Sequence, residues 1–174
     1  TEYICLGKDG GYAIYDGNII SSDGSHLPVE KFENSFHELQ KQNEVIKKVD
    51  HEGKSYMIGA IARINNSRSK LNPQAAQYLE SLNFTFPDYN PFHNILCQMV
   101  EVIHCIEESS KLIKELLNAN LENVVTRPYE IKEGVGVAAV EAPRGTLYYH
   151  VEVDGKGYVK NVNIITPTAQ FLAN

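Results

Sequence analysis

The chain has 174 residues, of which 43% are hydrophobic and 22% charged, and its formal net charge is −6. This length is sufficient for one well-buried core, so we expect a single domain over residues 1–174. The acidic balance argues against a general nucleic-acid binder, which needs a basic face. No apolar run approaches membrane-spanning length and no signal peptide is recognisable, so we expect a cytoplasmic protein.

The beginning of the chain is predicted to be rich in β-structure. Short apolar segments at 3–6, 12–15 and 19–20 alternate with glycine-rich turns. This alternation is typical of a β-meander, in which consecutive short strands pair with one another.

One helix is predicted after the meander, over residues 28–42. Its apolar residues recur at three- and four-residue steps behind a proline that suits the first helical turn. The segments 45–49 and 55–61 are predicted to form a second strand pair around the turn 51–54.

Two further helices are predicted in the middle of the chain. Asn72 before Pro73 is a typical helix start, so residues 73–82 are predicted to be helical. From Phe92 to Asn118 the apolar residues follow a helical period. This pattern predicts one helix of about seven turns, or two helices with a bend at Ser109-Ser110.

The long helix carries Cys97, Glu101, His104 and Cys105 on one face, because residues three or four apart are neighbours. One interpretation of this stripe is a metal site. The other is packing in the core, which we favour because free cysteines are often buried and no complete tetrahedral ligand set of close pairs is present. The three cysteines of the chain, which include Cys5, contain no C-x-x-C pair and predict no disulfide framework.

Arg63 lies in a glycine- and alanine-containing segment, Gly59–Asn65. Exposed arginines are common and buried ones are usually paired. We therefore expect a structural role for Arg63, either in a pair with an acidic neighbour or at a subunit face.

The C-terminal part is centred on a β-hairpin. Alternating segments at 146–153 and 158–165 flank Asp154-Gly155-Lys156-Gly157, where glycine supplies the positive φ of a tight turn. The segment 134–137 contains two glycines but lacks the third glycine and the following helix of a dinucleotide-binding loop. It therefore predicts a strand and not a phosphate cradle.

The two ends of this hairpin carry the candidate site. Glu-Ala-Pro-Arg-Gly (141–145) precedes the first strand and Thr-Pro-Thr (166–168) follows the second, so Arg144 and Thr168 are predicted to be neighbours. A guanidinium on a proline-fixed backbone beside a hydroxyl suits the recognition of an anion. The alternative is a surface corner with an ordinary solvated arginine.

Together these elements predict an α+β fold. A β-rich part with one helix (1–60) forms the N-terminal meander, and a helical part (70–118) contributes a long central helix with shorter ones packed on it. The C-terminal β-hairpin (134–170) carries the site residues.

Two stretches resemble a known family. The series EAPRG, LYYHVEVDGKG and IITPTAQ, in register from Glu141 to Gln170, resembles the large (alpha) subunit of nickel-iron hydrogenases in their soluble, cofactor-linked branch. The pattern G-x-x-A-R-x-N followed by L-x-P, which begins at Gly59, resembles the same family. The two C-x-x-C motifs that bind the metals in that family are absent here, so the resemblance implies an internal fragment of a hydrogenase large subunit.

The resemblance implies that the parent protein catalyses the reversible heterolytic cleavage of H2. Electrons would pass to an iron-sulfur small subunit and to further electron-acceptor subunits. The cofactor of the parent would be a nickel-iron centre with cyanide and carbon monoxide on the iron, accompanied by a magnesium ion. We expect the isolated fragment to carry none of these and to be inactive.

The resemblance also implies roles for individual residues. Arg144, positioned by Pro143, would overhang the open side of the nickel-iron centre and polarise bound hydrogen; a role as a base is disfavoured by the very high pKa of arginine. Thr168, next to Pro167, would donate a hydrogen bond to a cyanide ligand. The backbone carbonyl of Ile164 would contribute to the magnesium site. Each of these groups tunes a metal whose direct ligands come from elsewhere.

Two alternatives remain open. The quinone-site subunit of respiratory complex I shares the fold without the metal site, although Arg144 and the segment 166–168 favour the hydrogenase. A freestanding binding or assembly module on the same scaffold would never carry metal, and the absence of all four cysteine ligands is in its favour.

Overall fold

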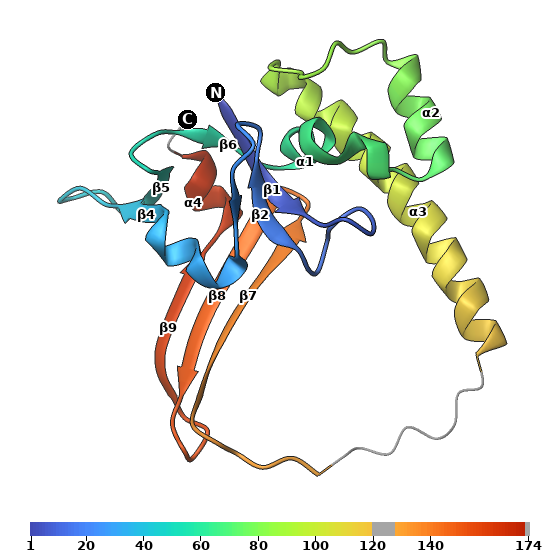
Figure 1. The fold of residues 1–174 in the computed structure, drawn as a ribbon. Helices are drawn as coiled ribbons and strands as arrows, with labels where there is room; N and C mark the ends of the chain where they lie inside the picture. Colours follow the sequence, from blue (N-terminus) through green and yellow to red (C-terminus); the bar gives the residue numbers. More distant parts are fainter. Residues whose placement is uncertain (120–127, 173–174) are drawn as a thin grey trace.

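Residues 1–119 and 128–172, the part of the chain that the computed structural model describes, form three β-sheets and four α-helices (Figure 1). The predicted α+β fold is confirmed. Two hydrophobic clusters form the core, one among the sheets and one between the first sheet and the helices. No helix in these ranges combines the length and hydrophobicity that crossing a bilayer requires.

The first sheet has the strand order β3-β2-β1-β6. Its central strand β1 (Glu2–Gly7) pairs antiparallel with β2 (Asn18–Ser21), which pairs with β3 (His26–Leu27). Strand β6 (Tyr56–Met57) joins the other side of β1 in parallel. Five consecutive residues of β1 are buried, because the sheet is covered on both faces.

The meander is confirmed in its first and last strands and wrong in the middle one. Residues 12–15 form no strand; instead the carbonyl of Ile14 accepts a hydrogen bond of 2.7 Å from the backbone N–H of Glu141. A contact with a distant segment therefore satisfies this backbone in place of local pairing.

The helix predicted over residues 28–42 is wrong. Only a 3-10 turn forms, Val29–Asn34, and the chain then extends into β4 (Phe36–Leu39), which pairs antiparallel with β5 (Lys48–His51). The apolar spacing that suggested a helix serves two elements, since Phe32 and Phe36 each pack a ring against Tyr148. Packing between distant segments has overridden the local period here.

The strand pair predicted from 45–49 and 55–61 is also wrong. The first segment contributes to β5, whose partner is β4, and the second divides between β6 and a helix. The turn 51–54 does form, with an isolated bridge between His51 and Lys54, but the chain then departs to reach β1.

The helix α1 (Ala60–Ser67) is buried almost all round and packs against β1 and the long helix α3 (Asn94–Asn118). The predicted helix α2 (Pro73–Ser81) is confirmed and lies along α3. Its N-terminus is satisfied by the neighbouring helix, because the carboxylate of Glu107 accepts hydrogen bonds from the backbone N–H groups of Gln74 and Ala75.

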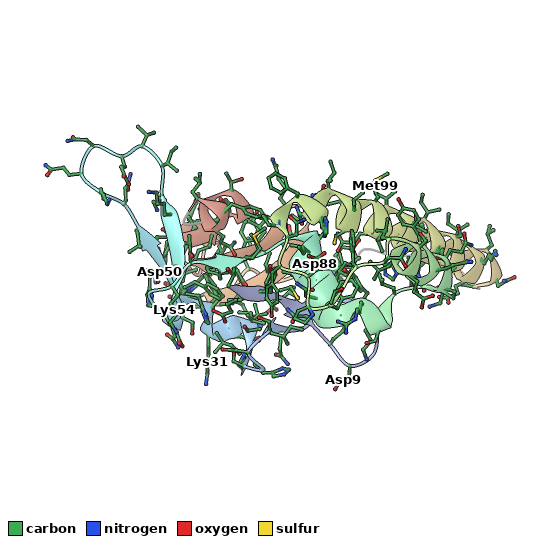
Figure 2. The ribbon with its side chains drawn as sticks, turned by 90° about the horizontal axis from the view of Figure 1, so that it is seen from above. Asp9, Lys31, Asp50, Lys54, Asp88 and Met99 are labelled. Atoms are coloured by element: carbon green, nitrogen blue, oxygen red, sulfur yellow. The ribbon has the colours of Figure 1, made fainter. Side chains whose placement is uncertain are left out.

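The long helix α3 is continuous, so the single-helix alternative is confirmed and no break occurs at Ser109-Ser110. Its C-terminal half extends beyond the body of the molecule (Figure 1). Met99 lies on the outer side of this helix (Figure 2). Many large apolar side chains of α3 are exposed to solvent: Ile95, Met99, Val102, Ile106, Leu112, Ile113, Leu116 and Leu117.

The C-terminal sheet has three antiparallel strands, β7 (Gly134–Ala142), β8 (Gly145–Val153) and β9 (Val159–Ile165), followed by α4 (Pro167–Phe171). The predicted hairpin of β8 and β9 is confirmed, as is a strand at Gly134. Sequence reasoning missed the pairing of β7 with β8, which creates a second hairpin whose turn is Pro143-Arg144.

Candidate functional site

The turn between β7 and β8 is the corner that sequence reasoning selected. Ala142 pairs with Gly145, so Pro143 and Arg144 occupy the tip of the turn and both are exposed. Gly145 has a φ of +138°, and a Cβ atom on it would lie 2.3 Å from Cδ1 of Ile58. A glycine is therefore required for the corner to pack against the segment that leads into α1.

The other predicted site residues lie at the same end of the β8–β9 pair as the corner, at the end of β9 and in α4. Thr166 begins this helix, Pro167 occupies its first position and Thr168 is exposed. Ile164 lies in β9 opposite Tyr149 and its side chain is 40% exposed.

A buried glutamine fixes α4 to β8. Gln170 is fully buried; its Nε2 donates to the carbonyl of Thr146 at 2.7 Å, and its Oε1 accepts from the hydroxyl of Tyr56 at 3.0 Å. A buried amide with these bonds holds the helix in one position.

The corner and α4 meet at the start of α1. Gly59, with a φ of +88°, precedes this helix, and a Cβ atom on it would lie 3.2 Å from the carbonyl oxygen of Arg144 and 3.5 Å from the ring of Phe171. Within the described ranges the side chain of Arg144 makes no hydrogen bond or ion pair, so it does not bond to Thr168 there. The predicted anion-binding pair therefore stays a prediction.

Behind the corner lies a buried cluster of one arginine and two glutamates. Arg63, only 3% exposed, projects from α1. Its Nε and Nη2 donate to both carboxylate oxygens of Glu101, at 2.5 and 2.7 Å, and its Nη1 donates to Glu141 at 2.7 Å. The expected pairing of Arg63 with an acidic neighbour is confirmed.

The same guanidinium holds the backbone of the corner. Nη1 of Arg63 also donates to the carbonyl of Ala142 at 3.1 Å, and Nη2 donates to the carbonyl of Pro143 at 3.2 Å. All five N–H donors of the guanidinium are thus used, and the planar fork fixes their directions.

Glu141 is the second acid of this cluster and the first residue of the EAPRG series. Its Oε1 accepts from the backbone N–H of Leu6 at 2.7 Å and from the hydroxyl of Thr146 at 2.8 Å. Burial raises the pKa of Glu141, while Arg63 and these hydrogen bonds oppose the rise. Because each of these partners is a donor, the geometry satisfies the ionised carboxylate.

Glu101 also receives a hydrogen bond of 2.7 Å from the hydroxyl of Tyr12. Burial, with the nearby Glu101 carboxylate, raises the pKa of Tyr12 and keeps its hydroxyl protonated. A cavity of about 640 Å³ opens beside this cluster, between α3 and the end of β7. Its floor is polar, with Arg63 and Glu101, and its walls include the apolar side chains of Val102, Ile106 and Ile113.

The stripe on α3 divides between the core and the surface. Cys97 and His104 are buried, and Nδ1 of His104 accepts from the backbone N–H of Asn72 at 3.0 Å, whereas Cys105 is exposed. Core packing is confirmed for the first two. No group of three or more His, Cys, Asp or Glu side chains within 1–119 and 128–172 is arranged to hold a metal ion.

Sequence reasoning missed the roles of Glu141 and Gln170, and it did not identify Glu101 as the partner of Arg63. One signal was available for Glu141. Ala139 and Glu141 are two apart in a strand and share a face, and Ala139 is an apolar, inward residue. An acid on such a face needs a cation or several donors.

Comparison with known proteins finds hydrogenase subunits among the relatives of this chain. No protein-family model matches the chain. It is 36% identical over 162 residues to sulfhydrogenase 1 subunit alpha of Pyrococcus furiosus, covering 93% of this chain and 37% of that protein. It is 32% identical over 132 residues to the NAD-reducing hydrogenase HoxS subunit beta of Cupriavidus necator, covering 72% and 26% respectively.

The solved structures agree in fold. An NAD+-reducing [NiFe]-hydrogenase in the H2-reduced state matches with a TM-score of 0.74 and 24% identity, covering 98% of this chain and 40% of that chain. A [NiFeSe] hydrogenase variant from Desulfovibrio vulgaris Hildenborough matches with a TM-score of 0.60 and 16% identity, covering 97% and 42%.

The fold and these matches define a class: the chain is a homologue of hydrogenase large subunits. More particularly, it is homologous to the subunits named alpha in the sulfhydrogenases and A in the F420-non-reducing hydrogenases. The chain spans about two fifths of the length of the curated relatives that it matches over nearly all its residues, 37% in the sulfhydrogenase 1 and 39% in the Methanococcus voltae protein.

Proposed function

We propose that this chain is an internal part of the large subunit of a nickel-iron hydrogenase, and that the whole protein oxidises or produces H2. The observation that carries this proposal is the corner at Pro143-Arg144. Its backbone is held from behind by Arg63, while the guanidinium of Arg144 is exposed and makes no bond within the described ranges. Such a cation is available to a group outside these residues.

The residues present suit the surroundings of a nickel-iron centre and not its direct ligation. Cys5 and Cys97 are fully buried and Cys105 is exposed, and within the described ranges none of them belongs to a group of three or more potential ligands arranged to hold a metal ion. The four cysteine ligands would therefore come from polypeptide outside this sequence. When bound, the centre would supply the metal on which H2 is split.

Three groups of this chain would act on that centre. Arg144 would direct its fixed donors at the open side of the centre and stabilise negative charge there, a role that requires no loss of its proton. Thr168 would donate a hydrogen bond to an anionic ligand, with Pro167 setting the backbone at the first turn of α4. The carbonyl of Ile164 would face the accompanying magnesium ion.

The exposed face of α3 supports a larger assembly. Apolar side chains such as Ile106 and Ile113, 61% and 57% exposed, continue into the wall of the cavity beside Glu101. A surface of this kind is usually covered. Because the chain spans only about two fifths of its relatives' length, we propose that the rest of the large subunit covers it. An iron-sulfur small subunit would bind elsewhere and accept the electrons.

The test uses the full-length gene product with its partner subunits. H2-dependent dye reduction and the nickel and iron content are measured for the native protein and for Arg144→Lys, with Arg68→Lys as the matched control on an arginine away from the corner. Loss of one preorganised donor typically lowers turnover by about 10²- to 10³-fold. We expect that loss for Arg144→Lys at unchanged metal content, and native turnover for Arg68→Lys.

A second candidate is a binding or assembly module on the same scaffold. The sequence contains no C-x-x-C motif, and residues 1–119 and 128–172 contain no group of side chains arranged to hold a metal ion; both observations favour it. A full-length gene product that contains neither C-x-x-C motif nor nickel would contradict the hydrogenase proposal and support the module.

A further inference from the structure

We propose that Arg63 is a positioning residue: its guanidinium sets the backbone of the Ala142–Arg144 corner and thereby the direction in which Arg144 projects. This inference rests on the function proposed above for Arg144. Arg63 itself is buried and would not touch the metal centre or the substrate.

The geometry joins Arg63 to the two peptide groups directly before Arg144. Its Nη1 and Nη2 donate to the carbonyls of Ala142 and Pro143, at 3.1 and 3.2 Å. Because one rigid plane carries both donors, the two carbonyls cannot rotate independently. The backbone directly before Arg144 is therefore held, whereas the side chain of Arg144 makes no bond within the described ranges.

The orientation of this plane is fixed from two other elements. Glu101 on α3 accepts from Nε and Nη2 as a bidentate partner, and Glu141 on β7 accepts from Nη1. The guanidinium therefore cannot turn without breaking bonds to α3 or to β7.

The segment that leads into α1 completes this support. The carbonyl of Arg144 lies against Gly59, where a Cβ atom would be 3.2 Å away, and Gly145 lies against Ile58. Three consecutive carbonyls, those of Ala142, Pro143 and Arg144, thus face one short segment, Ile58–Arg63.

If Arg63 served only to stabilise the fold, its guanidinium would not need to bond to two carboxylates and two carbonyls at once. A buried ion pair can often be replaced by apolar side chains at little cost in stability, so its presence is weak evidence for a stabilising purpose. A lysine at position 63 would keep the charge, but a single ammonium group cannot reach both carboxylates and both carbonyls in fixed directions. Arg63→Lys therefore separates charge from geometry.

The experiment uses the full-length, metal-loaded gene product in four forms: native, Arg63→Lys, Arg144→Lys and the double variant. Arg68→Lys is the matched control, because Arg68 directly follows α1 and within the described ranges bonds to the carbonyl of Asn65 and lies over the ring of Phe86, away from the corner. Turnover, metal content and amide hydrogen exchange of the peptide 141–147 are measured for each form.

We expect Arg63→Lys to lower turnover by about 10²-fold at unchanged metal content, because a displacement of about 1 Å at a reacting group costs that much. In the Arg144→Lys background the same change should cost less than about threefold, since a residue that acts through another shows no additional effect. Amide exchange at Arg144 and Gly145 should accelerate in Arg63→Lys and stay native in the control.

Equal effects of Arg63→Lys with and without Arg144 would overturn the proposal, as would unchanged amide exchange at the corner. If Arg63→Lys does not accumulate as folded protein, Glu101→Gln replaces it, because it leaves Arg63 and its bonds to the corner in place and weakens the bidentate partner that fixes the guanidinium plane, along with the bond from Tyr12. The same two criteria then decide. If Arg144→Lys alone leaves turnover unchanged, the proposed function fails, and the exchange data still decide whether Arg63 fixes the corner.

Discussion

Gly145→Ala is expected to be strongly destabilising, because two independent costs meet at this position. An added Cβ would lie 2.3 Å from Cδ1, 2.8 Å from Cγ1 and 3.0 Å from Cβ of Ile58. Since the last of these atoms is attached directly to the backbone, a rotamer change cannot relieve the clash. Overpacking of this kind costs about 1–3 kcal/mol. The φ of +138° adds about 1–3 kcal/mol for a residue with a side chain.

The free energy of unfolding should therefore fall by about 2–6 kcal/mol in urea titrations followed by circular dichroism. Gly136→Ala is the matched control, because Gly136 lies in β7 with no atom within 4 Å of an added Cβ. Adding Ile58→Val to Gly145→Ala should recover part of the loss, although Ile→Val alone costs about 0.5–1.5 kcal/mol. A loss for Gly145→Ala no larger than that of Gly136→Ala would refute the close contact between the corner and Ile58.

Three further outcomes are expected. Burial lowers the pKa of His104 from 6.5, so His104 binds a proton more readily in the unfolded chain than in the folded one. The stability that this difference contributes is complete above pH 6.5. It is lost as the pH falls below 6.5, by at most about 1.4 kcal/mol per pH unit. Urea titrations at several pH values should reveal this slope, and His104→Gln should remove it. Iodoacetamide should label Cys105 first, because Cys105 is exposed whereas Cys97 is buried and burial raises the pKa of its thiol to about 12. Mass spectrometry that found Cys97 labelled equally fast would contradict this burial. Gln170→Leu should lower the free energy of unfolding by about 1–3 kcal/mol, since the carbonyl of Thr146 loses its donor; no loss in urea titrations would mean that α4 is held by other contacts.

The sequence predicted best the elements whose signal is local. The turn at Asp154–Gly157 and the alternation on either side fix the β8–β9 hairpin, and the period over Asn94–Asn118 fixes the long helix. Both depend on neighbours within one element. The segment 28–42 shows the limit of this reasoning, because its apolar residues serve contacts with β8 and β5 that local spacing does not contain.

The candidate site divides in the same way. The glycine and proline of EAPRG predict a corner from their own backbone preferences. The buried ion pairs that support that corner come from Arg63, 78 residues before Glu141, and from Glu101 on α3. Spacing along the chain predicts neither partner, because an ion pair between distant elements shows in the sequence only as a charged residue on an otherwise apolar face.

Arg63 in the buried cluster and the exposed Arg144 belong to one arrangement, in which, over the part of the chain that the structure describes, the first guanidinium is fully bonded and the second is free. The five donors of Arg63 are all used, so that this cation is committed to the protein and holds its backbone. Arg144, two residues after Ala142, keeps its donors free within the described ranges while its backbone is fixed. A preorganised donor is effective because little reorganisation is needed when charge develops near it. In the function proposed above, the arrangement would suit an electrostatic role for Arg144 better than a role as a proton acceptor, because a guanidinium group keeps its proton.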